Sequence, residues 1–336
     1  MKKFLSIAIA IIMVAGVLFL VGCDKGPEGT DTDAPATLKF GMGVVVSQSA
    51  KDATDEANGE GKLTVDIAAV TVDADGKIVK CVLDCAESTS NFTIDGAAVE
   101  AGDLRSKYEK GDDYGMSAIG TKEWYVQADS FAKLIEGKTI DEVKALMAED
   151  YKGTADVVNA GCTIYVSGFV KAIEAAVANA ADSKATADST LKLGVVTSQT
   201  NSETKIELAT TVVATALDEE SKVVVASTDA VSASFEFDEK GVCLTDTTAA
   251  IATKKALGAD YGMASSEYAD DLNGDGVVKE WFEQGAAFDA ALVGKNATEI
   301  GALAVETGYG AADLQTAGCT IHVGDMVKAA VKAATK

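Results

Sequence analysis

The sequence contains little of three kinds of residue on which many functions depend. Of 336 residues, one is histidine and two are proline, and 29 lysines and arginines stand against 52 aspartates and glutamates. The resulting net charge of −23 excludes the basic surface by which proteins bind nucleic acids. The single His322 excludes multi-histidine metal cages and haem attachment at Cys-x-x-Cys-His. With 48% apolar residues, the chain is globular and long enough for about two domains.

The amino terminus resembles a bacterial lipoprotein signal. Two lysines precede an almost unbroken apolar run over 4–21, which ends at Gly22 and Cys23. Small residues directly before a cysteine are typical of a lipobox, in which the cysteine is diacylated and the preceding segment is removed. We therefore expect a signal peptide over 1–22 and a lipid anchor on Cys23. The alternative is an uncleaved membrane-spanning helix, because the run reaches the lower length limit for a span.

Residues 23–36 predict a flexible tether. This stretch is rich in glycine, proline and aspartate and contains little that could form a core. Together with the lipid anchor, it predicts a folded body held at the extracellular face of the cell membrane.

The remaining chain is a tandem repeat. Three motifs recur in the same order in both halves: Asp-Tyr-Gly-Met at 113–116 and 260–263, Lys-Glu-Trp at 122–124 and 279–281, and Ala-Gly-Cys-Thr-Ile at 160–164 and 317–321. This order predicts two copies of one domain, over 37–180 and 190–336, with a linker over 181–189.

In each copy, the sequence pattern predicts strands in the first half and helices in the second half. Apolar residues alternate from Leu63 to Ala69 and resume at Ile78 after the turn over 73–76, which predicts a β-hairpin, and 206–225 repeats this pattern. The expected fold class is α+β, present twice.

Helices are expected in the second half of each copy. Apolar spacing of three and four predicts a helix over 124–135, and a closing helix is expected over 169–178. Capping-box patterns predict further helices that begin after Thr139 and Asn296.

Five cysteines lie beyond Cys23, an odd number that cannot pair completely. Cys81 and Cys85 lie four residues apart on a predicted strand, roughly 13 Å from each other, which is too far for a disulfide. We expect buried free thiols, because cysteine behaves as a small apolar residue. Metal ligands and a redox pair are the alternatives.

The Gly-Cys-Thr motif of each copy resembles the attachment site of FMN-binding domains of the RnfG and NqrC type. In that family an Asp precedes Ser/Thr-Gly-Ala-Thr and an apolar residue, and a flavin transferase (ApbE-like) esterifies FMN phosphate onto the final Thr. The matching segments here are Asp156 to Ile164 and Asp313 to Ile321, with Cys in place of the Ala and Ala in place of the Ser/Thr. The resemblance implies two covalent FMN groups, one on Thr163 and one on Thr320.

The resemblance also implies residues that surround the cofactor. Within the motif, the glycine two residues before the threonine lets the backbone approach the phosphate, and the helix that follows would help to stabilise its charge. The motif candidates are Gly161, Cys162, Gly318 and Cys319. Flat aromatic faces stack on flavins, and the ring candidates are Tyr114, Gly115, Met116, Trp124, Tyr261, Gly262, Met263 and Trp281. Core packing and plain turns are the alternative explanation for these residues.

As a whole, the mature chain resembles the flavinylated, PplA-like lipoproteins of Gram-positive extracellular electron transfer. In those systems an NADH dehydrogenase fills a membrane quinone pool, and the lipoprotein flavins pass electrons to external acceptors such as ferric iron. The resemblance implies an electron carrier rather than an enzyme with its own substrate site. The alternative is a non-redox binding lipoprotein, either an adhesin or a solute receptor. A hydrolase would need a nucleophile with a base, and copy one contains no histidine.

An insertion in copy two begins like a calcium loop. Asp271, Asn273 and Asp275 have the required spacing, but position twelve of the loop is Phe282 instead of a glutamate. Calcium binding would therefore need Glu280 or Glu283 as the closing ligand. A polar surface turn is the alternative.

Overall fold

The computed structural model describes residues 36–120, 122–150, 152–265 and 278–335. Copy one contains β1 (Lys39–Lys51), β2 (Gly59–Val72), β3 (Ile78–Phe92), α1 (Lys107–Lys110), η1 (Gly111–Tyr114), η2 (Met116–Ala118), α2 (Trp124–Leu134), α3 (Ile140–Lys144), α4 (Ala155–Ala160) and α5 (Ser167–Ala178). Copy two contains β5 (Thr190–Asn201), β6 (Lys205–Leu217), β7 (Val223–Glu236), α6 (Lys254–Leu257), η3 (Gly258–Tyr261), η4 (Met263–Ser265), α7 (Trp281–Leu292), α8 (Ala297–Gly301), α9 (Ala312–Thr316) and α10 (Gly324–Ala333). The element order therefore recurs, and the α+β class is confirmed.

Both sheets are antiparallel. One has the strand order β3-β2-β1-β4, in which β4 is the short strand Ala181–Asp182, and the other has the order β5-β6-β7. The predicted hairpins are present as β2–β3, with Val72 opposite Ile78, and β6–β7. The strand that precedes each hairpin, β1 and β5, was not predicted from the sequence. Strand β4 was not predicted either. It lies in the predicted linker and pairs with the start of β1.

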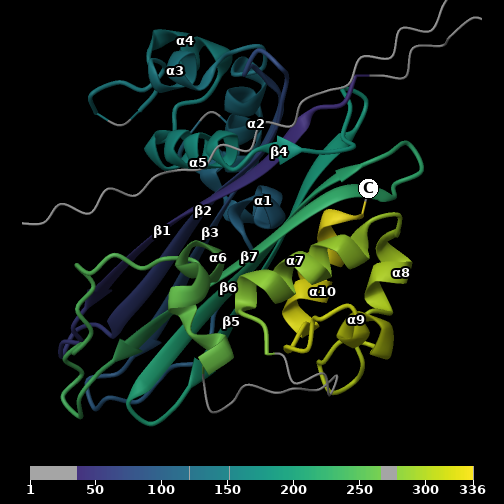
Figure 1. Ribbon diagram of the computed structural model, residues 1–336. Coiled ribbons are helices and arrows are strands. Elements are labelled where there is room, and N and C mark those ends of the chain that lie inside the picture. The colour runs from purple at the N-terminus through teal and green to yellow at the C-terminus, as the bar shows by residue number, and fades with distance from the viewer. Residues whose placement is uncertain (1–35, 121, 151, 266–277, 336) are drawn as a thin grey trace, which may run out of the picture. The chain divides into compact units, whose positions relative to one another are not determined.

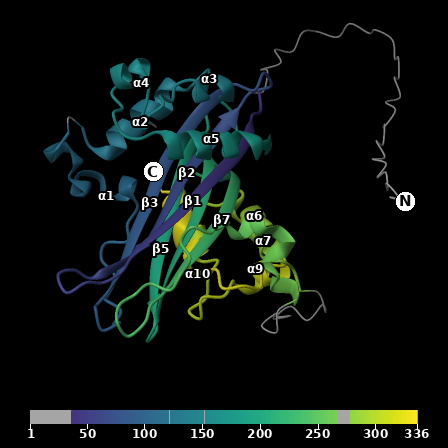
Figure 2. The same ribbon diagram turned by 90° about the vertical axis from the view of Figure 1, so that its left-hand side faces the viewer.

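The structure has four layers, with the two sheets packed face to face between two layers of helices. One apolar cluster joins β1 and β2 to β5, β6 and β7, and separate clusters join each sheet to the helices of its own copy. Figures 1 and 2 show α2 to α5 on one side of the strands and α7 to α10 on the other. The two copies therefore share a core.

Strand β2 is buried on both faces, because it lies between the other sheet and the helices of copy one. Leu63, Val65 and Ile67 face the other sheet, whereas Val70 and Val72 face the helices of copy one. All these side chains are at most 4% exposed. The simple alternation that predicted the strand therefore describes only one of two buried faces.

Glycines let the closing helices lie directly on the strands. A Cβ atom built on Gly43 of β1 would lie 2.0 Å from the carbonyl oxygen of Ala172 in α5. A Cβ atom on Gly194 of β5 would lie 1.9 Å from the carbonyl oxygen of Ala329 in α10. Since real Cβ atoms do not approach so closely, both crossings require a residue without a side chain.

The predicted helix starts are confirmed by their capping interactions. The Thr139 side chain accepts a hydrogen bond from the backbone of Glu142, whose carboxylate accepts from the backbone of Thr139. Asn296 and Glu299 form the same reciprocal pair at the start of α8. Each pair satisfies two backbone donors that a helix end leaves open.

The expectation of free thiols is confirmed for the five described cysteines, four of which are buried. Burial raises the pKa of Cys162 to about 11 and that of Cys319 to about 12. Both thiols are therefore protonated at neutral pH and pack as small apolar groups.

We expect buried Asp84 to make the free energy of unfolding depend on pH. This carboxyl group, 4% exposed, accepts hydrogen bonds from the backbone of Cys85 and Tyr108, and burial raises its pKa to about 6. The unfolded carboxyl ionises near about 3.9, so the folded chain holds an extra proton between about pH 4 and 6. The free energy of unfolding should therefore fall as pH rises through this window.

Asp84→Asn should remove this fall, because an amide oxygen can accept the same two hydrogen bonds without titrating. Relative to the parent, the variant should gain up to about 3 kcal/mol between pH 4 and 7. Urea unfolding at several pH values measures this, with the exposed Asp55→Asn as the control. Parallel pH profiles for Asp84→Asn and the parent chain would contradict the assignment.

Candidate functional site

A cavity of about 570 Å³ lies beside the Gly-Cys-Thr motif of copy one. Its volume falls within the range of about 300–1,000 Å³ that is usual for small-molecule sites. Four of the predicted site residues line it, namely Tyr114, Met116, Trp124 and Thr163. Ile119, 90% exposed, and Tyr165, 66% exposed, line it too, so the cavity opens to solvent.

Gln127 of α2 holds Thr163 in place. Its Oε1 accepts hydrogen bonds from the backbone N of Thr163 at 2.8 Å and from Oγ1 of Thr163 at 2.9 Å. Its Nε2 donates to the backbone oxygen of Lys122 at 3.0 Å and contacts Sδ of Met116 at 3.3 Å. Gln127 is 2% exposed, whereas Thr163 is exposed, so a buried amide orients a hydroxyl group that remains accessible.

Copy two contains the same arrangement. Gln284 Oε1 accepts from the backbone N of Thr320 at 2.8 Å and from its Oγ1 at 3.1 Å. Gln284 Nε2 donates to the backbone oxygen of Lys279 at 2.9 Å. The arrangement is thus a property of the repeated fold and does not depend on one local sequence.

A second repeated residue ties the loop before the helix to the helix start. The Glu123 carboxylate accepts hydrogen bonds from the backbone N of Met116 and of Ser117, each at 3.0 Å. Glu280 does the same for Met263 at 2.9 Å and Ala264 at 3.2 Å. The sequence signal for these roles was the repeated Lys-Glu-Trp together with a glutamine three residues after the tryptophan. The sequence had suggested only a possible calcium contact for Glu280 and no role for Glu123 or the two glutamines.

The predicted aromatic residues form the inner side of the site. Trp124 is 4% exposed and packs edge-on against Phe169, with ring centroids 5.6 Å apart. Lys107 Nζ lies over the Tyr114 ring at 5.4 Å and the Trp124 ring at 5.9 Å, and it pairs with Glu87 at 3.0 Å. A cation over an aromatic face is a favourable contact. No sequence pattern had pointed to Lys107.

The equivalent residues of copy two are arranged similarly. Lys254 Nζ lies 5.3 Å from the Tyr261 ring centroid and 5.8 Å from that of Trp281. Trp281 is 3% exposed.

The chain's single histidine, His322, packs against Tyr309 with ring centroids 3.9 Å apart.

Several predicted site residues lie outside the cavity. Cys162 and Cys319 are fully buried in the helix-facing clusters of their copies. Gly115 and Gly262 each have φ of +73°, a left-handed conformation that favours glycine. A Cβ atom on Gly115 would meet nothing within 4 Å, so the turn itself accounts for this glycine.

The candidate calcium ligands Asp271, Asn273 and Asp275 lie outside the described residues, as does Cys23. Both candidate closing ligands have other contacts, since Glu280 binds the backbone amides given above and Glu283 accepts from the backbone N of Glu280. In the described part of the chain, no three His, Cys, Asp or Glu residues are grouped to hold a metal ion.

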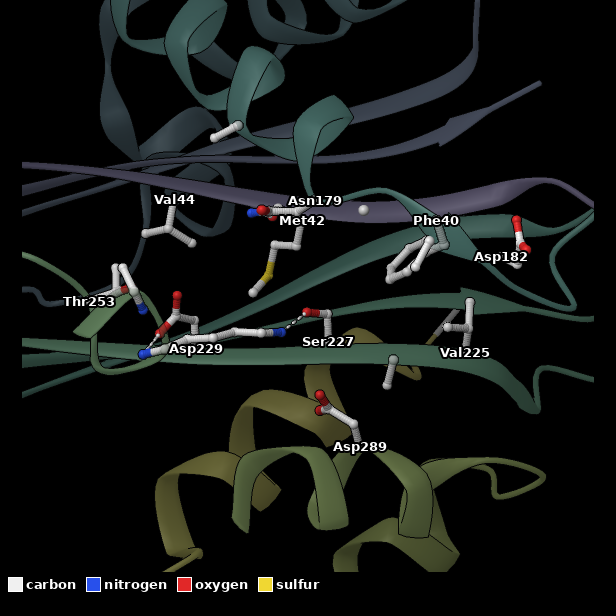
Figure 3. A pocket seen from close by; sticks show the side chains of 16 residues that line it. Phe40, Met42, Val44, Asn179, Asp182, Val225, Ser227, Asp229, Thr253 and Asp289 are labelled. Atoms are coloured by element: carbon white, nitrogen blue, oxygen red, sulfur yellow. Dashed lines mark hydrogen bonds between the residues drawn. The ribbon is translucent and has the colours of Figure 1, made fainter. Parts of the chain in front are cut away.

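A second cavity, of about 510 Å³, lies between strands β1 and β7 (Figure 3). Phe40, Met42 and Val225 contribute apolar side chains, and Asp229 and Asp289 contribute carboxylates. Asp229 accepts from the backbone N of Lys255 and Ala230, and Asp289 accepts from the backbone and hydroxyl of Thr228. These carboxylates therefore serve the fold, and the cavity lies away from both threonines of the motif.

Comparisons with known proteins give one distant relative. The chain is 30% identical over 131 residues to a protein named chlorophenol reductase from Desulfitobacterium hafniense, a match that covers 34% of this chain. The chain spans about two fifths of that relative's length, since the match covers 40% of it. No family model matches the chain, and no solved structure matches it.

Among helices within 36–120, 122–150, 152–265 and 278–335, none has the length and apolar character needed to cross a membrane.

Proposed function

We propose that each copy carries one FMN in phosphoester linkage, on Thr163 in copy one and on Thr320 in copy two. The observation that supports this most directly is the repeated threonine–glutamine pair. In both copies a buried amide holds the hydroxyl of the motif threonine by a hydrogen bond to its Oγ1. Because these hydrogen bonds fix the position of each threonine hydroxyl beside the motif, the arrangement agrees with a role in attachment.

The residues of copy one fit a flavin. The cavity is large enough for a drug-sized ligand and lies directly beside Thr163. Trp124 and Tyr114 supply aromatic surface, and Lys107 supplies a positive charge near it. The opening at Ile119 and Tyr165 would leave part of the ring accessible for electron exchange.

The attachment requires an activated donor. Oγ1 of the threonine bonds to the FMN phosphorus of a flavin dinucleotide, the phosphoanhydride bond to the nucleoside monophosphate breaks, and the hydroxyl proton goes to solvent. A flavin transferase would catalyse this step. Once bound, the flavin supplies the redox chemistry, and the protein supplies orientation and the surrounding charges.

We further propose that the protein is a lipid-anchored electron carrier at the extracellular face of the cell membrane. It would accept electrons from a membrane quinone pool supplied by an NADH dehydrogenase and pass them to external acceptors such as ferric iron. The name of the distant relative denotes a reductase, which agrees with a redox role. Covalent attachment suits this location, since a dissociated cofactor outside the cell would be lost.

Co-expression of the full chain with a flavin transferase tests the proposal. After denaturing electrophoresis, the protein band should retain flavin fluorescence. The intact mass should increase by two FMN groups, each less one water. A colourless chain of unmodified mass would overturn the proposal and favour a non-redox binding lipoprotein.

A further inference from the structure

A lysine side chain lies against the glycine of the Gly-Cys-Thr motif in both copies. A Cβ atom built on Gly161 would lie 2.3 Å from Nζ of Lys122. A Cβ atom built on Gly318 would lie 2.1 Å from Nζ of Lys279. Gly161 has φ of +99° and Gly318 has φ of +94°, so the left-handed backbone conformation favours glycine at both positions.

The same lysines are bonded to the residue that holds the threonine. Gln127 donates to the backbone oxygen of Lys122 and accepts from Thr163, and Gln284 links Lys279 to Thr320 in the same way. Each lysine and threonine are therefore placed by one buried amide, although 41 residues separate Lys122 from Thr163 and Lys279 from Thr320.

Among the described residues, no carboxylate pairs with Lys122 or Lys279. Within the described ranges, neither ammonium group makes a hydrogen bond or an ion pair. The adjacent carboxylates of Glu123 and Glu280 bind backbone amides instead. In a chain with a net charge of −23, an unpaired ammonium at the same place in both copies is suited to bind an anion.

The backbone N–H groups of the motif are not free to bind an anion. The N–H groups of Gly161, Cys162 and Thr163 all donate within the protein, to Val158, Val157 and Gln127 respectively. The same three positions in copy two donate to Gln315, Leu314 and Gln284. A phosphate on either threonine thus needs a donor from a side chain.

The first turn of α5 in copy one lies close to a carboxyl group of the protein. A Cβ atom built on Gly168 would be 2.1 Å from Oδ2 of Asp66. An anion at a helix N-terminus is stabilised by the helix dipole, but in copy one the Asp66 side chain lies beside this turn. A side-chain donor is therefore the better candidate for the phosphate in this copy.

We propose that Lys122 and Lys279 are positioning residues that bind the phosphate of the flavin being attached to Thr163 and Thr320. This inference rests on the proposed function. During attachment, each ammonium group offsets the charge on the FMN phosphate as Oγ1 bonds to phosphorus and the nucleoside monophosphate of the flavin dinucleotide leaves. In the finished phosphodiester, the same ammonium group holds the remaining charge.

The test follows attachment at each threonine separately. The unmodified full chain is treated with a flavin transferase and a flavin dinucleotide, and mass spectrometry of the peptides gives the rate at Thr163 and at Thr320. Lys122→Met should slow attachment at Thr163 by roughly tenfold, the effect of losing one charge-assisted hydrogen bond. Thr320 in the same molecule is the internal control, and Lys279→Met should show the reverse pattern.

Two further measurements separate a charge effect from a structural one. Lys122→Arg keeps the charge and should restore most of the rate at Thr163. In fully loaded protein, Lys122→Met should shift the ³¹P resonance of the Thr163 phosphodiester and leave that of Thr320 unchanged.

The outcomes distinguish the two proposals. Normal attachment rates in both methionine variants would overturn the lysine assignment and leave the flavin proposal standing. Slower attachment with an unchanged ³¹P resonance would also overturn it, because the lysine would then contact the transferase and not the phosphate. No flavin on either threonine of the parent chain would overturn both proposals.

Discussion

Thr163→Ala is expected to leave the protein with one flavin, and the double variant Thr163→Ala, Thr320→Ala is expected to leave it with none. Alanine removes the only atom that can form the phosphoester, so the loss at each position should be complete. Gln127 and Gln284 each hold one threonine, and the two sites lie in different copies. Each single variant should therefore show half of the parental flavin absorbance per chain.

Two controls accompany these variants. Thr163→Ser keeps a hydroxyl group for Gln127 and should retain a flavin. Thr316 lies four residues before Thr320, the attachment site of copy two, and its exposed hydroxyl donates to the backbone oxygen of Ala312. Thr316→Ala removes this hydroxyl. It should retain both flavins. A Thr163→Ala protein that still carries two FMN groups by intact mass would show that the attachment site lies elsewhere.

Gly43→Val is expected to destabilise the fold by about 3 kcal/mol or more, and it is the most damaging substitution that we predict. Valine has a higher strand propensity than glycine, a preference that spans about 1 kcal/mol at most. The new side chain, however, would begin 2.0 Å from the carbonyl oxygen of Ala172 and 2.5 Å from the backbone N of Ala176. Backbone atoms of a packed helix cannot turn aside as a flexible side chain does, so α5 would have to move off the sheet.

Urea unfolding of Gly43→Val and Gly194→Val measures this effect. The matched control is Gly102→Ala, since a Cβ atom there would meet nothing within 4 Å. The control should change the free energy of unfolding by less than about 0.5 kcal/mol. Equal stability of Gly43→Val and Gly102→Ala would show that the helix does not rest on the strand at this position.

The elements that were predicted correctly are those whose signals are local. The hairpins follow from alternating apolar residues around a turn, and the starts of α3 and α8 follow from capping residues three positions apart. The first strand of each copy was missed although its apolar residues alternate, at Phe40, Met42 and Val44 and at Leu191, Leu193 and Val195. The positions between them include glycines, which are depleted in strands. At Gly43 and Gly194, the absence of a side chain reflects contact with a helix more than 100 residues later in the chain, which no local window contains.

In the candidate site, too, residues with a local sequence signal were predicted, whereas residues whose role depends on distant contacts were not. The motif threonines were found from their spacing and their repetition. The roles of Gln127, Lys107 and Lys122 were not found, since each depends on contacts between separate elements. A glutamine on a helix face gives no sign that its amide bonds to a threonine 36 residues later. The repetition of Lys-Glu-Trp-x-x-Gln was the available signal, but neither its lysine nor its glutamine was interpreted.

The apolar cluster shared by the two sheets means that neither copy has a complete interior of its own. Phe40, Leu63 and Ile67 are covered by residues of the second sheet, such as Leu208 and Phe235. A single copy in water would expose this surface and would need an identical partner to cover it, as the subunits of a dimer cover each other. The single polypeptide thus holds both halves of such a pair, so unfolding of either half would expose the apolar face of the other.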